Sequence, residues 1–196
     1  MKISPPRIAM LAAILLPSPL SAQSPVQDTV LIADRLFDSR TGTMLSNPVV
    51  VIRGDRIVSV KSGGMQPAGV RVIDLKGMTL VPGLIDMHTH IDSDPIYGGY
   101  NALQFGDRFW SMIAVANAAK TLQAGFTTIR NVGADAWNDV GLMQAIDQGK
   151  VTGPRIVPAG YAFGATGGHC DSTFFPPSMD QKNPYNADST TEARKS

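Results

Sequence analysis

From residue 84 onward, short apolar strands alternate with helices, and this alternation is the feature that most constrains the fold. The pattern predicts strands at 84–88, 126–132 and 155–159, separated by helices at 107–124 and 139–148. A helix that carries the chain from one strand to the next leaves the two strands parallel. The sequence therefore predicts an α/β fold built on a parallel sheet.

The first of these helices has recognisable ends and an apolar face. Asp107 suits the N-cap position, and Gly125 follows the last helical residue, where glycine is favoured. Apolar side chains recur at steps of three and four residues, at Phe109, Met112, Ile113, Ala116 and Ala119. This spacing places them on one face, which is expected to pack against the sheet.

Residues 23–80 follow a different pattern, made of short strands and turns. β-Branched residues favour four strands, at 29–34, 49–52, 56–60 and 70–74. Gly54-Asp55 predicts a tight hairpin turn, and Lys76-Gly77 predicts a further turn. We therefore expect an antiparallel meander, a small β layer whose open edges need another part of the protein to cover them.

Residues 1–22 have the character of an export signal. Lys2 and Arg7 provide a positive start, 8–16 is an apolar run, and 17–22 is rich in small residues and proline. The apolar run is about half of the roughly 20 residues that a membrane anchor requires. The sequence predicts cleavage after Ala22 and a soluble product in the periplasm or outside the cell, with no membrane span in the mature chain.

Charge and cysteine content exclude several classes of function. The 17 basic and 16 acidic residues leave a net charge of +1, so there is no basic excess to bind nucleic acid. The single cysteine, Cys170, excludes an internal disulfide and thiolate zinc modules. Any metal site must therefore use histidine and carboxylate ligands.

The candidate ligands stand at the end of the first strand of the alternating region. His88 and His90 are two residues apart, and side chains at this spacing on a strand point to the same face, about 6.6 Å apart along the strand. Their ring nitrogens can reach one metal ion, although such a pair also arises incidentally. Asp86 precedes them by the same step and is expected to orient a ligand or to be a buried, hydrogen-bonded carboxylate.

Three segments together resemble the amidohydrolase superfamily of metal-dependent hydrolases. They are residues 73–90, which include Val-Pro-Gly-Leu-Ile-Asp-Met-His-Thr-His, then Ala-Gly-Phe-Thr-Thr-Ile-Arg-Asn-Val-Gly at 124–133, and Gly-Pro-Arg-Ile at 153–156. The similarity is to the branch with imidazolonepropionase-like and Xaa-Pro dipeptidase-like enzymes. It implies the N-terminal portion of a split β-sandwich at 23–80, followed at 81–196 by the first three βα units of a (β/α)8 TIM-type barrel.

The resemblance also implies metal ligands, of which this chain has two. His88 and His90 match the histidine pair on the first barrel strand, which implies one or two zinc ions. The carboxylated lysine, the later histidines and the aspartate base of the family have no counterpart; Lys182 and Lys195 lie outside suitable strands. Asn131 stands where this branch leads us to expect aspartate. Because a full barrel takes about 250 residues, we expect the chain to be the first part of a longer enzyme.

The stretch after the third strand is a long loop that holds a further candidate. His169 follows Gly167-Gly168 and is expected to lie over the mouth of the barrel, where it can contact substrate. A lone loop histidine is also commonly a solvated side chain. Cys170 beside it is a poor nucleophile candidate, because a catalytic Cys–His pair normally comes from separate segments.

The functional prediction is the N-terminal segment of an exported, metal-dependent amidohydrolase. It would hydrolyse C–N bonds in a small-molecule or dipeptide-like substrate through metal-activated water. The alternative is a non-catalytic secreted domain that retains the scaffold and binds a ligand or partner. The missing ligand positions motivate this alternative, because zinc sites in proteins normally use three or four protein ligands.

Overall fold

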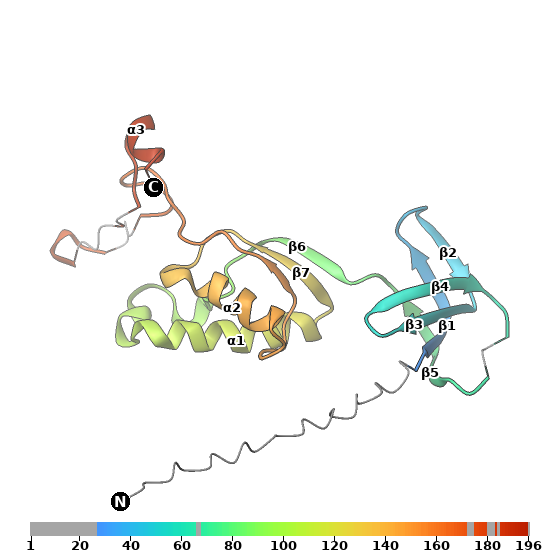
Figure 1. Cartoon of the computed structure of the whole chain (residues 1–196). Coiled ribbons are helices and arrows are strands. Elements are labelled where there is room, and N and C mark those ends of the chain that lie inside the picture. Colours follow the sequence, from blue (N-terminus) through green and yellow to red (C-terminus); the bar gives the residue numbers. More distant parts are fainter. Residues whose placement is uncertain (1–26, 66–67, 172–174, 180–182, 184, 196) are drawn as a thin grey trace, which may run out of the picture. The chain divides into compact units, whose positions relative to one another are not determined.

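The computed structural model describes residues 27–65, 68–171, 175–179, 183 and 185–195 (Figure 1). The predicted export signal at 1–22 lies outside the described residues. The chain divides into two compact units, Met1–Val81 and Pro82–Ser196. Among the helices that the structure describes, none has the length and apolar character needed to cross a bilayer.

The first unit is a five-stranded sheet. Its strands are β1 (Thr29–Asp38), β2 (Thr43–Ser46), β3 (Pro48–Arg53), β4 (Arg56–Ser62) and β5 (Arg71–Leu80). The order is β2-β1-β3-β4, and β5 pairs with β1. The hairpin between β3 and β4 turns at Gly54 as predicted, where a φ of 59° suits glycine.

Two expectations for this sheet are wrong. It is not a simple meander, because β5 returns alongside β1 and pairs with it in parallel. Lys76-Gly77 lies inside β5 and is not a turn between strands. Leu75 pairs with Ala33 and Thr79 pairs with Arg35, so the extra residues of β5 form a local irregularity. A positive φ of 82° at Gly77 belongs to this irregularity, and the ladder continues beyond it.

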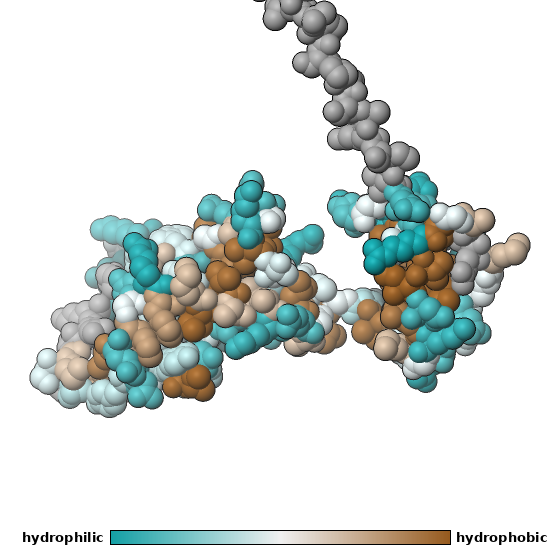
Figure 2. All heavy atoms as spheres, turned by 90° about the horizontal axis from the view of Figure 1, so that it is seen from below, coloured by the Kyte–Doolittle hydropathy of each residue, from teal (hydrophilic) through white to brown (hydrophobic). Residues whose placement is uncertain are grey.

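The sheet of the first unit leaves much apolar surface uncovered. Its buried apolar residues include Val30, Ala33, Pro48 and Val50. On β4, Ile57 and Val58 are exposed, with Ile57 66% accessible. Figure 2 shows apolar surface gathered on this unit. A solvated sheet face would instead carry polar side chains at such positions.

An ion pair joins the start of β1 to the end of β3. The Arg53 guanidinium donates to both carboxylate oxygens of Asp28, from Nε and a terminal nitrogen, each at 2.8 Å. This bidentate hydrogen bonding is the main cause that lowers the pKa of Asp28 below its ordinary value.

We expect the Arg53→Gln variant to lose a pH-dependent part of the stability of the first unit. The pKa of Asp28 is lower in the folded state, so the pair contributes stability above the unfolded pKa, and this is lost as pH falls through the folded pKa. Urea unfolding should therefore separate the stabilities of variant and wild type at pH 7, and this difference should shrink as pH falls below the ordinary pKa of aspartate, about 4. Arg35→Gln is the control. A stability difference between Arg53→Gln and wild type that did not change with pH would contradict the role given to the Asp28–Arg53 pair.

The second unit has a three-stranded parallel sheet with two helices between the strands. Its main elements are β6 (Leu84–Thr89), α1 (Asp107–Gln123), β7 (Phe126–Asn131), α2 (Asn138–Asp147) and β8 (Arg155–Val157). The strand order is β6-β7-β8, and both pairings are parallel, as the sequence predicts. Short 3-10 turns, η1 (Pro95–Tyr97), η2 (Gly99–Gln104), η3 (Asp135–Trp137) and η4 (Pro177–Met179), and helix α3 (Thr190–Ala193) complete the unit.

The face of α1 that packs on the sheet differs from the predicted one. Ala114 and Ala118, one turn apart, are the buried residues of the helix, whereas Met112 is 65% exposed. Their core partners include Ile129 of β7 and Ile156 of β8. Small side chains at this face let the helix lie close to the sheet. The N-cap is Gly106, and Asp107 is the first helical residue.

Candidate active site

The histidine pair lies where β6 ends. His88 is in the strand, and His90 is the first residue after it. Their ring centroids are 5.7 Å apart, with the ring planes at 68°. Both side chains are exposed. The structure therefore brings the two imidazoles together at the carboxyl end of the parallel sheet, where α/β folds place their active sites.

Asp86 does not contact either imidazole through a described hydrogen bond. Asp86 pairs with Ile129 and Thr89 pairs with Asn131, so β6 uses one more residue than β7 over this interval. This irregularity interrupts the two-residue alternation that predicts Asp86 and His88 on one face. The Asp86 carboxylate accepts a hydrogen bond from the backbone N–H of His88 at 3.0 Å. The structure thus shows it as a half-buried, hydrogen-bonded carboxylate that holds the backbone at the start of the histidine pair.

The orientation of His90 is set by a backbone carbonyl. Nδ1 of His90 lies 3.2 Å from the carbonyl oxygen of Gly133, which follows β7. A carbonyl oxygen only accepts hydrogen bonds, so Nδ1 carries the hydrogen. This tautomer leaves the lone pair on Nε2 available to a metal ion, which is the common arrangement of metal-binding histidines.

Asn131 is the centre of the hydrogen-bond network behind the pair. Its carboxamide is fully buried, and its oxygen accepts from the backbone N–H of Ile91 at 2.8 Å and from the Thr89 hydroxyl at 3.3 Å. Its nitrogen donates to the carbonyl of Gly133 at 2.9 Å and to the carboxylate of Asp139 at 3.1 Å. An aspartate at position 131 would place a carboxylate oxygen against two hydrogen-bond acceptors, the carbonyl of Gly133 and the carboxylate of Asp139. The side chain here must donate to both, which explains why asparagine stands in place of the expected aspartate.

Asp139 extends this network to the third strand. The carboxylate is fully buried at the start of α2, and it accepts hydrogen bonds from the backbone N–H groups of Ala159 and Gly160 at 2.9 and 3.1 Å. Its other oxygen accepts from the N–H of Val140 at 2.8 Å. These donors compensate the desolvated charge. Asn131 and Asp139 therefore connect the segments after β6, β7 and β8.

A second buried carboxylate, Asp92, joins the loop after β6 to the loop after β7. Its side chain accepts from the backbone N–H of Asp135 and from the Asn138 amide, each at 3.1 Å. Burial raises the pKa of Asp92 above its ordinary value; the two hydrogen bonds oppose this shift, and the negative charge of Asp135 adds to it. Sequence reasoning missed Asp92 and Asp139, because an acidic residue beside a loop or helix start usually faces solvent.

Arg130 supports the backbone at the irregular part of β6. Its Nε donates to the carbonyl oxygen of Met87 at 2.7 Å. Met87 directly precedes His88, so this bond and the one that the His88 N–H donates to Asp86 both hold the backbone beside the first imidazole. Such outer contacts orient ligands and commonly affect metal affinity.

The remaining sequence candidates do not join the histidine pair. His169 is exposed in a turn after β8. Across the described residues there is no group of three or more His, Cys, Asp or Glu side chains placed to hold a metal, so His169 does not complete such a group. Lys182 lies outside the described residues, and Lys195 follows α3.

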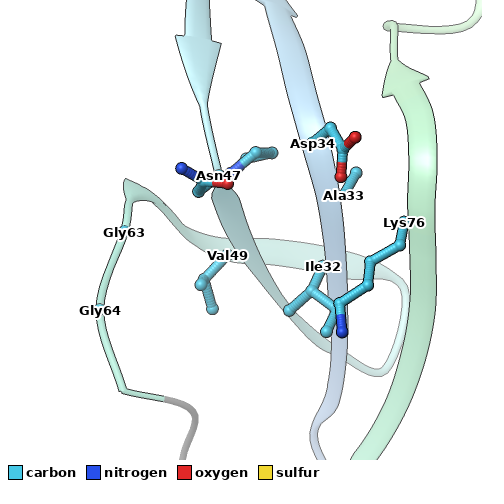
Figure 3. Close-up of a pocket in the computed structure, with 9 residues that line it drawn as sticks. Ile32, Ala33, Asp34, Asn47, Val49, Gly63, Gly64 and Lys76 are labelled. Atoms are coloured by element: carbon cyan, nitrogen blue, oxygen red, sulfur yellow. The ribbon is translucent and has the colours of Figure 1, made fainter.

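The first unit has a hollow of about 250 Å³ that is not a catalytic candidate (Figure 3). It lies beside β1 and β3, and its walls include Ile32, Val49 and the turn at Gly63-Gly64. Asp34 and Lys76 are the charged residues of its lining. None of the described residues that line it carries an imidazole or a thiol, so the chemistry points to the strand ends of the second unit.

The fold and the histidine pair agree with a comparison against known families. Residues 79–195 match the amidohydrolase family. This segment is more than half of the chain, and the chain belongs to that family. Its members are hydrolases that act on C–N bonds, and they generally bind divalent metal ions.

Two curated relatives are similar to about a third of the chain. An imidazolonepropionase of Alkaliphilus metalliredigens is 39% identical over 67 residues, which are 32% of this chain and 15% of that protein. An adenine deaminase of Brucella anthropi is 41% identical over 69 residues, 35% of this chain and 12% of that protein. These matches span a small part of each relative.

Solved structures match over more of the chain. A Xaa-Pro dipeptidase with bound methionine in its active site has a TM-score of 0.75 at 30% identity, covering 86% of this chain and 43% of that one. A prolidase complexed with N-methylphosphonate-L-proline has a TM-score of 0.65 at 34% identity, and the match covers 80% of this chain and 37% of the prolidase chain. The chain thus spans less than half the length of these amidohydrolase structures, whose fold is the TIM barrel.

The described residues fit a metal ion in part. His88 and His90 supply two imidazoles at the same strand end, and the bond from Nδ1 of His90 to Gly133 leaves Nε2 as the donor. Imidazole suits zinc and several other divalent transition metals. Two ligands are fewer than the three or four of most zinc sites.

Proposed function

We propose that this chain is the N-terminal part of an exported, zinc-dependent amidohydrolase that hydrolyses C–N bonds in small amides, including dipeptide-like and cyclic amides. The observation that carries the proposal is the pair His88 and His90 at the end of β6, with the tautomer of His90 set by Gly133. Family membership supports the C–N bond specificity, and the similarity to dipeptidase structures supports the substrate class.

In this proposal the residues of the chain hold and orient the metal. Zinc, when bound, lowers the pKa of a water molecule toward neutrality and polarises the scissile carbonyl. His88 and His90 provide two neutral imidazole donors, and the carbonyl of Gly133 keeps the Nδ1 proton of His90 in place. Asn131 and Asp139 hold that carbonyl from behind. No described residue is assigned as the general base.

The architecture in this proposal is larger than the chain. We infer that the five-stranded sheet is one part of a split β-sandwich, and that β6, β7 and β8 begin a (β/α)8 barrel. The uncovered apolar face of the first unit supports the first inference, because a partner sheet would bury it. In the described part of the chain no strand pairs with the outer edge of β6 or β8, which supports the second inference, because a closed barrel has no edges.

The proposal predicts metal-dependent hydrolysis by the protein at its natural length. After export, the isolated protein should contain zinc and should release amino acids from Xaa-Pro dipeptides or open cyclic amides. Dialysis against a chelator should abolish turnover, and added zinc should restore it. Metal analysis and product detection by mass spectrometry measure both effects. Turnover that survives complete metal removal would overturn the proposal.

A second candidate is a secreted domain that keeps the scaffold without catalysis. It is favoured by one observation: the described residues contain no group of three metal-binding side chains. In this case the natural product would bind zinc weakly and show no hydrolysis, although it would fold. The metal content of the protein isolated from its source distinguishes the two.

A further inference from the structure

The second unit contains a cavity of about 540 Å³ to which no role has yet been assigned. Its lining combines four aromatic side chains and two carboxylates, from Phe105, Trp110, Tyr161, Phe175, Asp107 and Asp135. We propose that this cavity binds an organic cation, such as an amine, quaternary ammonium or guanidinium group carried by the substrate. This inference rests on the proposed hydrolase function in assigning the cation to a substrate.

The position of the cavity suits a substrate pocket. Its walls come from the segments that follow β6, β7 and β8, which end on the same side of the parallel sheet. The loops also connect to the histidine pair. The backbone N–H of Asp135 donates to Asp92, two residues after His90, and the carbonyl of Gly133 accepts from His90. The volume lies in the range of small-molecule pockets, about 300–1,000 Å³.

The aromatic walls are held in place by other rings. Phe105 stacks on Phe109, with ring centroids 4.1 Å apart and planes at 11°, and Trp110 meets Phe105 edge to face. In the segment after β8, Tyr161 stacks on Tyr185, with ring centroids 4.1 Å apart. Tyr97 also meets Phe105 edge to face, and Trp137 meets Tyr161 in the same way, so each wall ring is packed against several neighbouring rings. Such preorganised aromatic surfaces bind cations through the negative potential of the ring face.

The charge of the cavity selects for a cation. Among the described residues that line it, Asp107 and Asp135 are the charged ones, and none is lysine or arginine. Neither carboxylate takes part in the ion pairs found among the described residues. A bound cation would therefore meet two negative charges and, within the described lining, no competing positive side chain. A neutral ligand of the same shape would gain only the apolar contacts.

The test compares two probes of nearly the same shape. Choline carries a quaternary ammonium, and 3,3-dimethylbutan-1-ol replaces its nitrogen by carbon. We expect the protein at its natural length to bind choline about tenfold more tightly than the alcohol, measured by calorimetry at low ionic strength. Equal affinities, or no binding of choline, would overturn the proposal.

Variants distinguish the two parts of the site. Asp107→Asn with Asp135→Asn should remove most of the preference for choline, and Trp110→Leu should weaken choline binding about fivefold or more. Asp147→Asn and Phe163→Leu, at residues outside the lining, are the matched controls. The aspartate variants change exposed side chains, so they test the proposal even if Trp110→Leu fails to fold. Unchanged discrimination in the double aspartate variant would contradict the assignment.

Metal removal separates this proposal from the hydrolase proposal. Choline binding should persist after chelation, because no lining residue is one of the two proposed ligands. Persistent choline binding in a protein without metal-dependent hydrolysis would leave the cation pocket standing and overturn the enzymatic proposal. Metal-dependent hydrolysis in a protein that binds choline no better than the alcohol would overturn the cation pocket and leave the hydrolase proposal standing.

Discussion

Replacing both His88 and His90 by alanine is expected to lower zinc affinity at least about 100-fold in the protein at its natural length and to abolish metal-dependent hydrolysis. The estimate is conservative, because changes to outer-shell partners alone commonly cost 10–100-fold, and this variant removes two direct donors. The imidazoles lie together at the end of β6, with their centroids 5.7 Å apart. Zinc content after dialysis and competition with a chromogenic chelator measure the effect.

The matched control for this variant is His169→Ala. His169 is exposed and belongs to no three-membered ligand group in the described part of the chain, so its removal should leave zinc affinity unchanged. Both imidazoles of the pair are exposed, and their loss should cost little folding stability. Unchanged zinc content in a folded double variant would show that the metal binds elsewhere.

Asp139→Leu is expected to lower the free energy of unfolding by about 3–5 kcal/mol, the usual cost of removing one partner from a buried charged network. Asp139 is fully buried and accepts hydrogen bonds from Asn131 and from the backbone at Ala159 and Gly160. Leucine has the same branched arrangement of heavy atoms but leaves these donors without an acceptor, and each buried donor without a partner is costly. Urea unfolding at neutral pH measures the change.

Asp147→Leu is the control for this prediction, because Asp147 ends the same helix and is exposed. It should change stability by less than about 0.5 kcal/mol. The Asp139 variant should also weaken zinc binding, since Asn131 would lose one of the contacts that hold it against Gly133. A stability loss below about 1 kcal/mol would mean that the buried network is not the main connection between the strand ends.

Local features of the sequence were enough to predict the parallel sheet and the histidine pair. The alternation of apolar strands and helices after residue 84 depends on side-chain periodicity, and β6, β7 and β8 are parallel as expected. His88 and His90 are close in sequence on one strand, so their proximity needs no long-range contact. The turn at Gly54 is likewise a property of neighbouring residues.

Features that depend on distant segments were decided only by the tertiary structure. Turn-forming residues at Lys76-Gly77 stay inside β5, because pairing with β1 continues on both sides of the irregularity. The packed face of α1 is set by how close the helix comes to the sheet, which selects Ala114 and Ala118 over larger apolar neighbours.

The roles of Asn131 and Asp139 and the presence of the cavity also depend on contacts between distant segments, so the sequence did not predict them. The four donors and acceptors around Asn131 come from the ends of two strands and from α2, and Asp139 adds the segment after β8. A sequence determines which polar groups are present, but their burial and partners depend on which segments meet. The periodicity of this chain determined its strands, its helices and its histidine pair, whereas the hydrogen-bond network and the cavity depend on the meeting of the segments that follow three strands.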